Sequence, residues 1–149
     1  NLFWTLIMAA STQPIFPNVP LYGTCSLAAA TTGRTVTGTT GLTQIALSGT
    51  NTNGMRIDRI RYVQNGAISS APSANVIRIW IYSGTGNAQL MEEYAISSPT
   101  TPTASTSGSS LDTNYLTLVL PSGYSLWASV HTYAGAQDGY NIELFGGLY

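Results

Sequence analysis

Charged side chains are scarce in this chain. Asp, Glu, Lys and Arg together make up 7% of its 149 residues, whereas ordinary soluble domains carry about 25%. Lysine is absent, and all five basic residues are arginine. Soluble monomers rely on surface charge to stay apart from one another. The scarcity therefore indicates a chain that places much of its surface against other subunits.

Basic groups and thiols are too few for several classes of function. The net charge is −1, whereas a nucleic-acid-binding surface needs clustered Lys and Arg to neutralise phosphates. Electrostatic docking to acidic membranes needs the same basic charge. The single cysteine, Cys25, has no intrachain disulfide partner, and we interpret it as a small buried hydrophobic residue. We therefore expect neither a nucleic acid nor a membrane as partner.

Groups suited to catalysis are equally sparse. His131 is the only histidine, and no nucleophile-elbow pattern occurs, so we interpret it as a surface or interface residue. One histidine and one cysteine are too few for a zinc site. Glu92 and Glu93 lie in an expected strand and point to opposite faces, whereas glycoside hydrolysis needs two facing carboxylates. The sequence predicts no enzyme and no cofactor.

The apolar spacing of an amphipathic helix is also missing. Thr, Ser, Val, Ile and Tyr predominate instead, and these residues favour strands. Turn signals such as Asn53-Gly54, Asn65-Gly66 and Asp138-Gly139 recur about every ten residues. We therefore predict an all-β fold: an antiparallel two-sheet β-sandwich of about eight strands, jelly-roll-like in arrangement.

The first 20 residues differ in composition from the rest. An apolar run from Leu2 to Ala10 precedes three prolines between Pro14 and Pro20, and it is shorter than the ~20 residues that span a bilayer. We predict an extended apolar arm with a Pro-rich linker over residues 1–20, and a single β-sandwich domain over residues 21–149. The arm docks either on its own subunit or on a neighbour, through Leu2, Phe3, Trp4, Leu6 and Ile7.

Alternating residues and turn signals place the expected strands at residues 35–39, 42–48, 55–63, 76–82, 89–96, 115–120, 125–132 and 140–145. Strands 35–39 and 42–48 are expected to form a first pair. Residues 97–110 are rich in Ser, Thr, Pro and Gly, and we expect a long exposed loop there.

The clearest expected strand changes phase at its centre. Met55 and Ile57 point one way, whereas Ile60 and Tyr62 point together but out of phase with them. A β-bulge at Asp58-Arg59 reconciles the two halves, because one inserted residue reverses the facing of those that follow.

Charged groups concentrate on that same strand, at Arg56, Asp58, Arg59 and Arg61. They form either local pairs on an exposed face, which contribute little energy, or inter-subunit salt bridges, because arginine binds carboxylates through two hydrogen bonds and tolerates partial burial. The expected strand 76–82 places its isoleucines in the core. Its opposite face is a solvated or a contact face and carries Arg78, Trp80 and Tyr82.

Four segments of the sequence carry a resemblance to known proteins. They are Gly54-Met55-Arg56-Ile57-Asp58-Arg59-Ile60-Arg61, Val76-Ile77-Arg78-Ile79-Trp80-Ile81-Tyr82, Leu118-Val119-Leu120-Pro121-Ser122-Gly123-Tyr124-Ser125-Leu126-Trp127-Ala128-Ser129 and Phe145-Gly146-Gly147. Their order over residues 42–147 is similar to that of a group of small virion proteins of tailed bacteriophages. The resemblance implies a β-sandwich subunit that decorates or cements a capsid, commonly as a trimer. The arm before Pro14 and the loop at 97–110 depart from the pattern.

We therefore expect a structural virion protein on the capsid exterior. It is expected to be a cement or decoration subunit that contacts itself as a homotrimer and also contacts the major capsid protein. The alternative is a tail-associated adhesin or lectin-like module that binds carbohydrate, with Trp80, Tyr82 and Trp127 stacked on sugar rings. A hydrolase that uses His131 ranks below both.

Deletion of residues 1–12 is predicted to leave the sandwich folded but to weaken assembly. An apolar segment docked on a neighbour contributes several kcal/mol, at about 25 cal/mol per Å² before ordering costs. Circular dichroism checks the fold and sedimentation checks the assembly. A truncated protein that assembled as well as the intact one would exclude this role for the arm.

Overall fold

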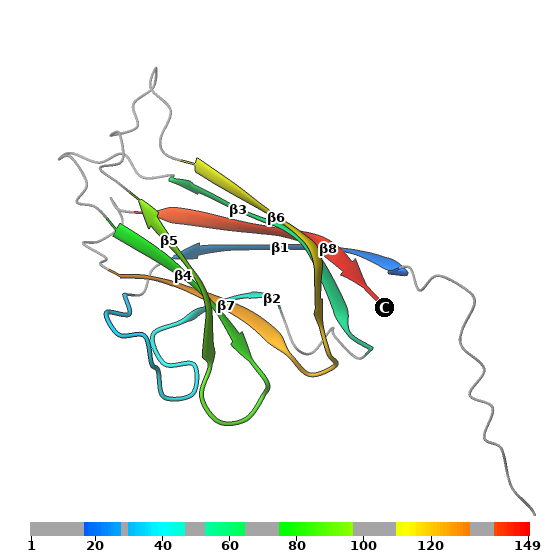
Figure 1. The fold of residues 1–149 in the computed structure, drawn as a ribbon, viewed down its shortest axis with the longest axis horizontal. Coiled ribbons are helices and arrows are strands. Elements are labelled where there is room, and N and C mark those ends of the chain that lie inside the picture. Colours follow the sequence, from blue (N-terminus) through cyan, green and yellow to red (C-terminus); the bar gives the residue numbers. More distant parts are fainter. Residues whose placement is uncertain (1–16, 28–29, 47–52, 65–74, 97–109, 132–138) are drawn as a thin grey trace, which may run out of the picture.

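The computed structural model describes residues 17–27, 30–46, 53–64, 75–96, 110–131 and 139–149. Within these ranges the chain forms eight strands and no helix (Figure 1). In chain order the strands are β1 (Val19–Leu27), β2 (Thr43–Ala46), β3 (Met55–Gln64), β4 (Asn75–Tyr82), β5 (Gln89–Ile96), β6 (Ser110–Leu120), β7 (Ser125–Val130) and β8 (Tyr140–Leu148).

The strands form two sheets of four, and every neighbouring pair is antiparallel. Sheet A has the order β1-β8-β3-β6, and sheet B has the order β2-β7-β4-β5. The predicted all-β, antiparallel two-sheet sandwich is confirmed. We interpret the order as a jelly roll, because β1·β8, β2·β7, β3·β6 and β4·β5 are the pairs of one long hairpin ribbon that has been rolled into two sheets.

The core lies between the inner faces of the two sheets. Ile77 and Ile79 on β4 are fully buried, and Ile81 packs against the same core cluster, which confirms the predicted isoleucine face. On β7 the predicted alternation is confirmed as well, because Leu126 and Ala128 are buried at every second position. Burial of this apolar surface is the main driving force for folding the sandwich.

The predicted bulge in β3 is confirmed. The register of β3 shifts between Ile57 and Arg59 against β6 and against β8. Ile57 lies before the shift and Ile60 and Tyr62 after it, yet all three are buried. The extra residue thus returns the apolar side chains to the core after the phase change.

The strand predicted at residues 35–39 is wrong. These residues belong to the connection 30–42, in which Gly38 and Gly41 have positive φ angles of 60° and 74°. Such conformations suit turns rather than a strand. The eighth strand is β1, which begins at Val19, inside the predicted linker. β1 is the edge of sheet A, where Pro20 is tolerated because one side of an edge strand has no ladder partner.

Gly146 lies opposite the bulge, in register with Ile57. A Cβ at this position would overlap the carbonyl oxygen of Arg56. We predict that Gly146→Ala destabilises the fold by about 2 to 3 kcal/mol, because backbone atoms have to move. Gly38→Ala is the control: open space surrounds it, and only its positive φ costs about 1 kcal/mol. Urea unfolding measures both, and equal losses would contradict the role given to Gly146.

Candidate functional site

The predicted contact residues divide among three places in the molecule. Those of the arm, Leu2, Phe3, Trp4, Leu6 and Ile7, lie outside the described residues. Those of β3 lie together on the outer face of sheet A, and those of β4 lie on the outer face of sheet B. The two outer faces differ in what covers them.

The bulge in β3 brings three arginines to the outer face of sheet A. Arg56 lies before the register shift, and Arg59 and Arg61 lie after it. In register with the latter two on β8 are Phe145 and Glu143. Three of the five arginines of the chain thus share one sheet face.

These arginines are bound within the subunit. Arg56 donates from Nε to Asp58 Oδ1 at 2.7 Å and from Nη2 to Oδ2 at 3.1 Å. The hydrogen bond to Asp58 is the main cause that raises the pKa of Arg56. Arg61 Nη1 lies 3.6 Å from Glu143 Oε2. The local pairs of the first alternative are therefore present, and inter-subunit bridges from the same groups stay a prediction.

An aromatic pair adjoins the arginines. The Arg59 guanidinium lies 4.2 Å from the centre of the Phe145 ring, a cation–π distance. Tyr22 on β1 contacts Phe145 with ring centres 5.2 Å apart, and its hydroxyl donates to Glu143 Oε1 at 3.4 Å. No sequence pattern placed Tyr22, Glu143 and Phe145 in this site, because only the pairing of β1 with β8 and of β8 with β3 brings them beside the arginines.

Large exposed apolar side chains also lie on the two edge strands of sheet A. Within the described residues they are Val19 at 53%, Tyr22 at 58% and Val119 at 51% exposure. Val19 and Tyr22 belong to β1 and Val119 to β6, the two edge strands of this sheet. A hollow of about 390 Å³ lies between the start of β1 and Arg56. Apolar side chains flanking a polar centre are consistent with a contact surface.

The outer face of sheet B is covered instead. Trp80 is 0% exposed and Arg78 is 5% exposed. Trp80 Nε1 donates to Ser129 Oγ at 3.0 Å, and Tyr82 packs edge-to-face against Trp127 with ring centres 6.3 Å apart. The expectation that Trp80 and Arg78 offer a contact face, or that Trp80 stacks on a sugar, is wrong, because their surface is buried within the subunit.

The connection 30–42 runs along this face, beside β4 and β7 in Figure 1, and its Thr31 carbonyl accepts a hydrogen bond from Arg78. At one end Thr31 N–H donates to the Val130 carbonyl at 2.8 Å. At the other end Ala88 N–H donates to the Gly38 carbonyl, and Gly38 N–H donates to Asn87 Oδ1, each at 2.9 Å. Trp80 lies on the sheet between these anchors. The burial of Trp80 could not be predicted from the sequence around it, because the connection beside it comes from a distant part of the sequence.

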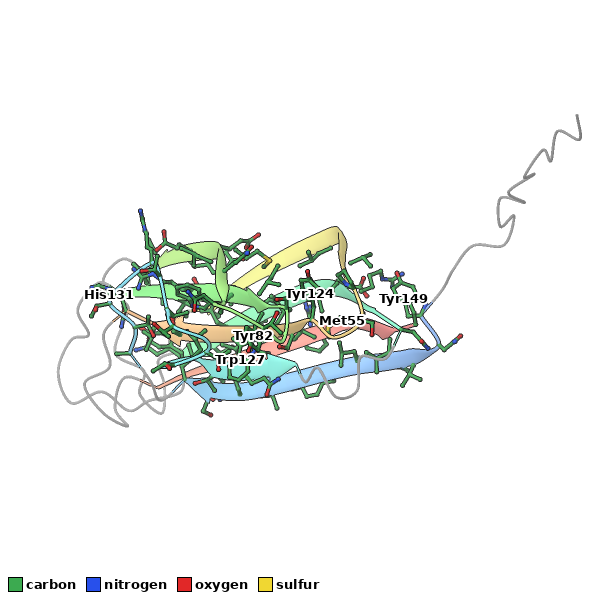
Figure 2. The ribbon with its side chains drawn as sticks, turned by 90° about the horizontal axis from the view of Figure 1, so that it is seen from below. Met55, Tyr82, Tyr124, Trp127, His131 and Tyr149 are labelled. Carbon is green, nitrogen blue, oxygen red and sulfur yellow. The ribbon has the colours of Figure 1, made fainter. Side chains whose placement is uncertain are left out.

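His131 lies at one end of the sandwich, far from Tyr149 at the other end (Figure 2). Its Nδ1 atom is 3.4 Å from Arg78 Nη1. The opposite facing of the two adjacent glutamates is confirmed: Glu92 accepts a hydrogen bond from the inward-facing Tyr94, and Glu93 binds Arg78 on the outer face. Within the described ranges no three His, Cys, Asp or Glu side chains form a group that could hold a metal.

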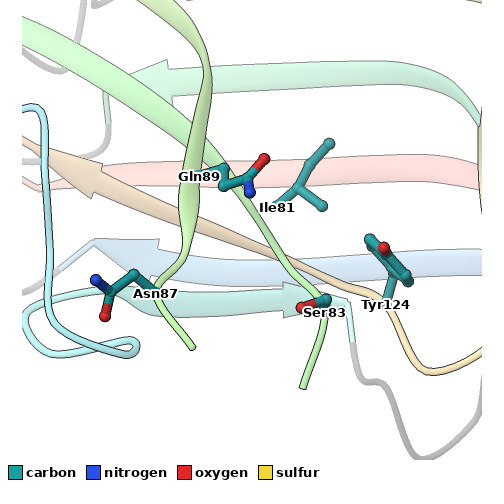
Figure 3. A pocket seen from close by; sticks show the side chains of 5 residues that line it. All are labelled: Ile81, Ser83, Asn87, Gln89 and Tyr124. Atoms are coloured by element: carbon teal, nitrogen blue, oxygen red, sulfur yellow. The ribbon is translucent and has the colours of Figure 1, made fainter. Parts of the chain in front are cut away.

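A small pocket opens between β4, β5 and the start of β7 (Figure 3). Its volume is about 70 Å³, whereas pockets for small-molecule ligands hold about 300 Å³ or more. It has room for a few water molecules. The lining residues are Ile81, Ser83, Asn87, Gln89 and Tyr124.

In the part of the chain that the structure describes, no helix is sufficiently long and apolar to span a membrane. Comparison of the chain with known protein families and with curated proteins finds no match. The outer face of sheet A, defined by Tyr22, Arg56, Arg59, Arg61, Val119, Glu143 and Phe145, is therefore the candidate site on geometry alone.

Cys25 is predicted to react slowly as a nucleophile. It packs against the core, and burial raises the pKa of its thiol to about 12. Because the thiolate is the reactive form, native protein at pH 8 should react with a disulfide reagent at least about a hundredfold more slowly than protein in urea. Absorbance of the released thiol measures both rates. Equal rates would show that the native thiol is accessible and ionised.

Proposed function

We propose that this chain is a structural subunit that assembles with copies of itself through sheet A, as a capsid cement or decoration protein of a virion. One observation carries the proposal. On the outer face of sheet B, beside the chain's own connection 30–42, Arg78 and Trp80 are buried, yet the outer face of sheet A keeps exposed aromatic, aliphatic and arginine side chains. A chain with so few charges has little else to keep such a face in water.

The arginine pairs suit a surface that becomes covered. Exposed ion pairs contribute little to the stability of a lone subunit. Inside an interface an unpaired charge is strongly unfavourable, and Arg56 and Arg61 already have carboxylate partners in Asp58 and Glu143. Neighbouring subunits can then bury the aromatic pair Tyr22–Phe145 with Arg56 and Arg61 still paired, while Arg59 contacts the Phe145 ring. Aromatic residues and arginine are enriched in such interfaces.

The positions of the apolar residues favour a cyclic assembly. Tyr22 lies at the β1 edge of sheet A and Val119 at the β6 edge. Two different patches on opposite edges fit a head-to-tail contact, in which the β1 edge of one copy meets the β6 edge of the next. Head-to-tail contacts that close generate rings, whereas a two-fold dimer uses one patch twice. This supports a homotrimer over a two-fold dimer.

The edge of β6 favours contact through side chains over a continuous sheet. Its pairing with β3 jumps from Leu118 to Asn114 while β3 advances from Ile57 to Arg59. Such an irregular edge is a poor template for another strand. The resemblance of four sequence segments to tailed-phage virion proteins supports the narrower reading, in which the ring sits on the major capsid protein.

The carbohydrate-binding alternative has less support. Its three candidate stacking residues are Trp80, Tyr82 and Trp127. Trp80 has no exposed surface. Tyr82 and Trp127 pack edge-to-face, and Trp127 Nε1 donates to Ser125 Oγ at 2.9 Å, so they do not form a coplanar platform for a sugar ring.

Two charge substitutions test the ring. Tyr22→Lys blocks the β1 edge and Val119→Lys blocks the β6 edge, and each is expected to weaken association at least about tenfold. Native mass spectrometry should find trimers of the unsubstituted protein and monomers of each variant. An equal mixture of the two variants should form a dimer containing one of each, because one intact β1 edge still meets one intact β6 edge.

Thr37→Lys on the connection 30–42 is the control and should leave the trimer intact, because Thr37 is exposed and its neighbour Gly38 is bonded beside sheet B, not sheet A. A monomeric unsubstituted protein at high concentration would contradict self-assembly. A trimer insensitive to both edge substitutions would contradict this geometry but not assembly itself. Co-sedimentation with particles of the major capsid protein separates a cement subunit from other oligomers.

A further inference from the structure

Glu93 joins two parts of the chain on the outer face of sheet B. Its Oε1 atom accepts from Arg78 Nε on β4 at 2.8 Å. Its Oε2 atom lies 2.8 Å from Arg34 Nη2 on the connection 30–42. The Arg78 side chain is 6% exposed and that of Arg34 is 73% exposed. One carboxylate thus ties a buried and an exposed arginine together.

Arg78 has two further contacts at the same place. Its Nη1 atom donates to the carbonyl oxygen of Thr31, at the start of the connection, and lies 3.4 Å from His131 Nδ1 at the end of β7. Among the described carboxylates, only Glu93 forms an ion pair with this guanidinium. A buried cation without its counter-charge is strongly destabilising. The closed position of the connection here therefore depends on ionised Glu93.

The other end of the connection is held by neutral groups. Gly38 exchanges hydrogen bonds with Ala88 and with the side-chain amide of Asn87. None of these groups titrates. Trp80 is buried on the sheet between the ionic anchor at Glu93 and the neutral anchor at Gly38.

We propose that the connection 30–42 is an acid-released latch: protonation of Glu93 frees the segment around Arg34 from sheet B and exposes Trp80, while the two sheets stay folded. A protonated Glu93 no longer compensates the buried charge of Arg78. Both arginines stay charged throughout and repel one another once the carboxylate is neutral. This latch does not depend on the proposed assembly role.

The direction of the pH dependence follows from the contacts. The hydrogen bond from Arg78, followed by that from Arg34, holds the pKa of Glu93 below its ordinary value. The closed latch is therefore stabilised at neutral pH, and this stabilisation is lost as the pH falls below about 4.3 toward the lowered pKa. His131 also lies beside Arg78, so the test must separate its contribution from that of Glu93.

Acrylamide quenching of Trp80 tests the proposal in the full chain with Trp4→Phe and Trp127→Phe, which leave Trp80 as the fluorophore. In this double variant the acrylamide quenching constant of Trp80 should rise at least about tenfold between pH 7 and pH 3. Such a rise corresponds to an at least tenfold larger population of molecules with the connection released. Far-UV circular dichroism should keep its strand signal over the same range. Loss of both signals together would mean global unfolding and would overturn the latch.

Glu93→Gln should give strong quenching already at pH 7 and little dependence on pH. Asp58→Asn is the matched control, because it breaks an arginine–carboxylate pair on the other sheet, and it should follow the parent protein. His131→Gln should keep the rise in quenching as the pH falls below about 4.3. A Glu93→Gln variant that protected Trp80 like the parent, or an Asp58→Asn variant that exposed it, would overturn the proposal. Loss of the acid-dependent rise in the His131→Gln variant would overturn it as well.

If Glu93→Gln fails to fold, the variant Arg34→Met tests the latch instead. It removes the exposed partner of Glu93 and leaves the Arg78–Glu93 pair in place. The latch then has one ionic tie fewer, and Trp80 quenching at pH 7 should lie between the parent value at pH 7 and that at pH 3. Quenching equal to the parent at every pH would overturn the proposal.

Discussion

The bulge between Ile57 and Arg59 is the constraint on which the rest of the structure depends. Strand side chains alternate with a period of two, so a regular β3 could not bury both Ile57 and Ile60. With the extra residue, the apolar positions on both sides of the shift face the core and the arginines face outward. Gly146 allows this, because its missing Cβ leaves room for the backbone at Arg56. Core and candidate surface thus come from one irregularity.

Local alternation predicted much of the fold. The phase change in β3, the isoleucine face of β4 and the alternation of β7 were readable because each lies within one strand. The strand predicted at residues 35–39 was wrong, because their Thr and Val favour strands whereas positive-φ glycines turn the chain there. The burial of Trp80 and the contact of Tyr22 with Phe145 depend on segments far apart in sequence. The residue pattern within one strand does not indicate which distant segment will pack against it.

The few charges of this chain are used for specific contacts rather than for solvation. Each of the five arginines contacts a carboxylate or an aromatic ring. On sheet B a single carboxylate, Glu93, secures the chain's own cover over an indole. On sheet A the paired arginines stand beside exposed apolar edges. The same type of pair thus holds the connection 30–42 against sheet B and binds two of the arginines on the open face of sheet A.

The irregular edge of β6 has a consequence for aggregation. A chain almost without charge has weak colloidal repulsion, so a straight exposed strand would invite runaway stacking of copies into fibrils. The jump in pairing between Asn114 and Leu118 interrupts the row of backbone donors and acceptors that such growth requires. This edge therefore opposes amyloid-like growth through its backbone shape, in a chain that has no lysine to place there.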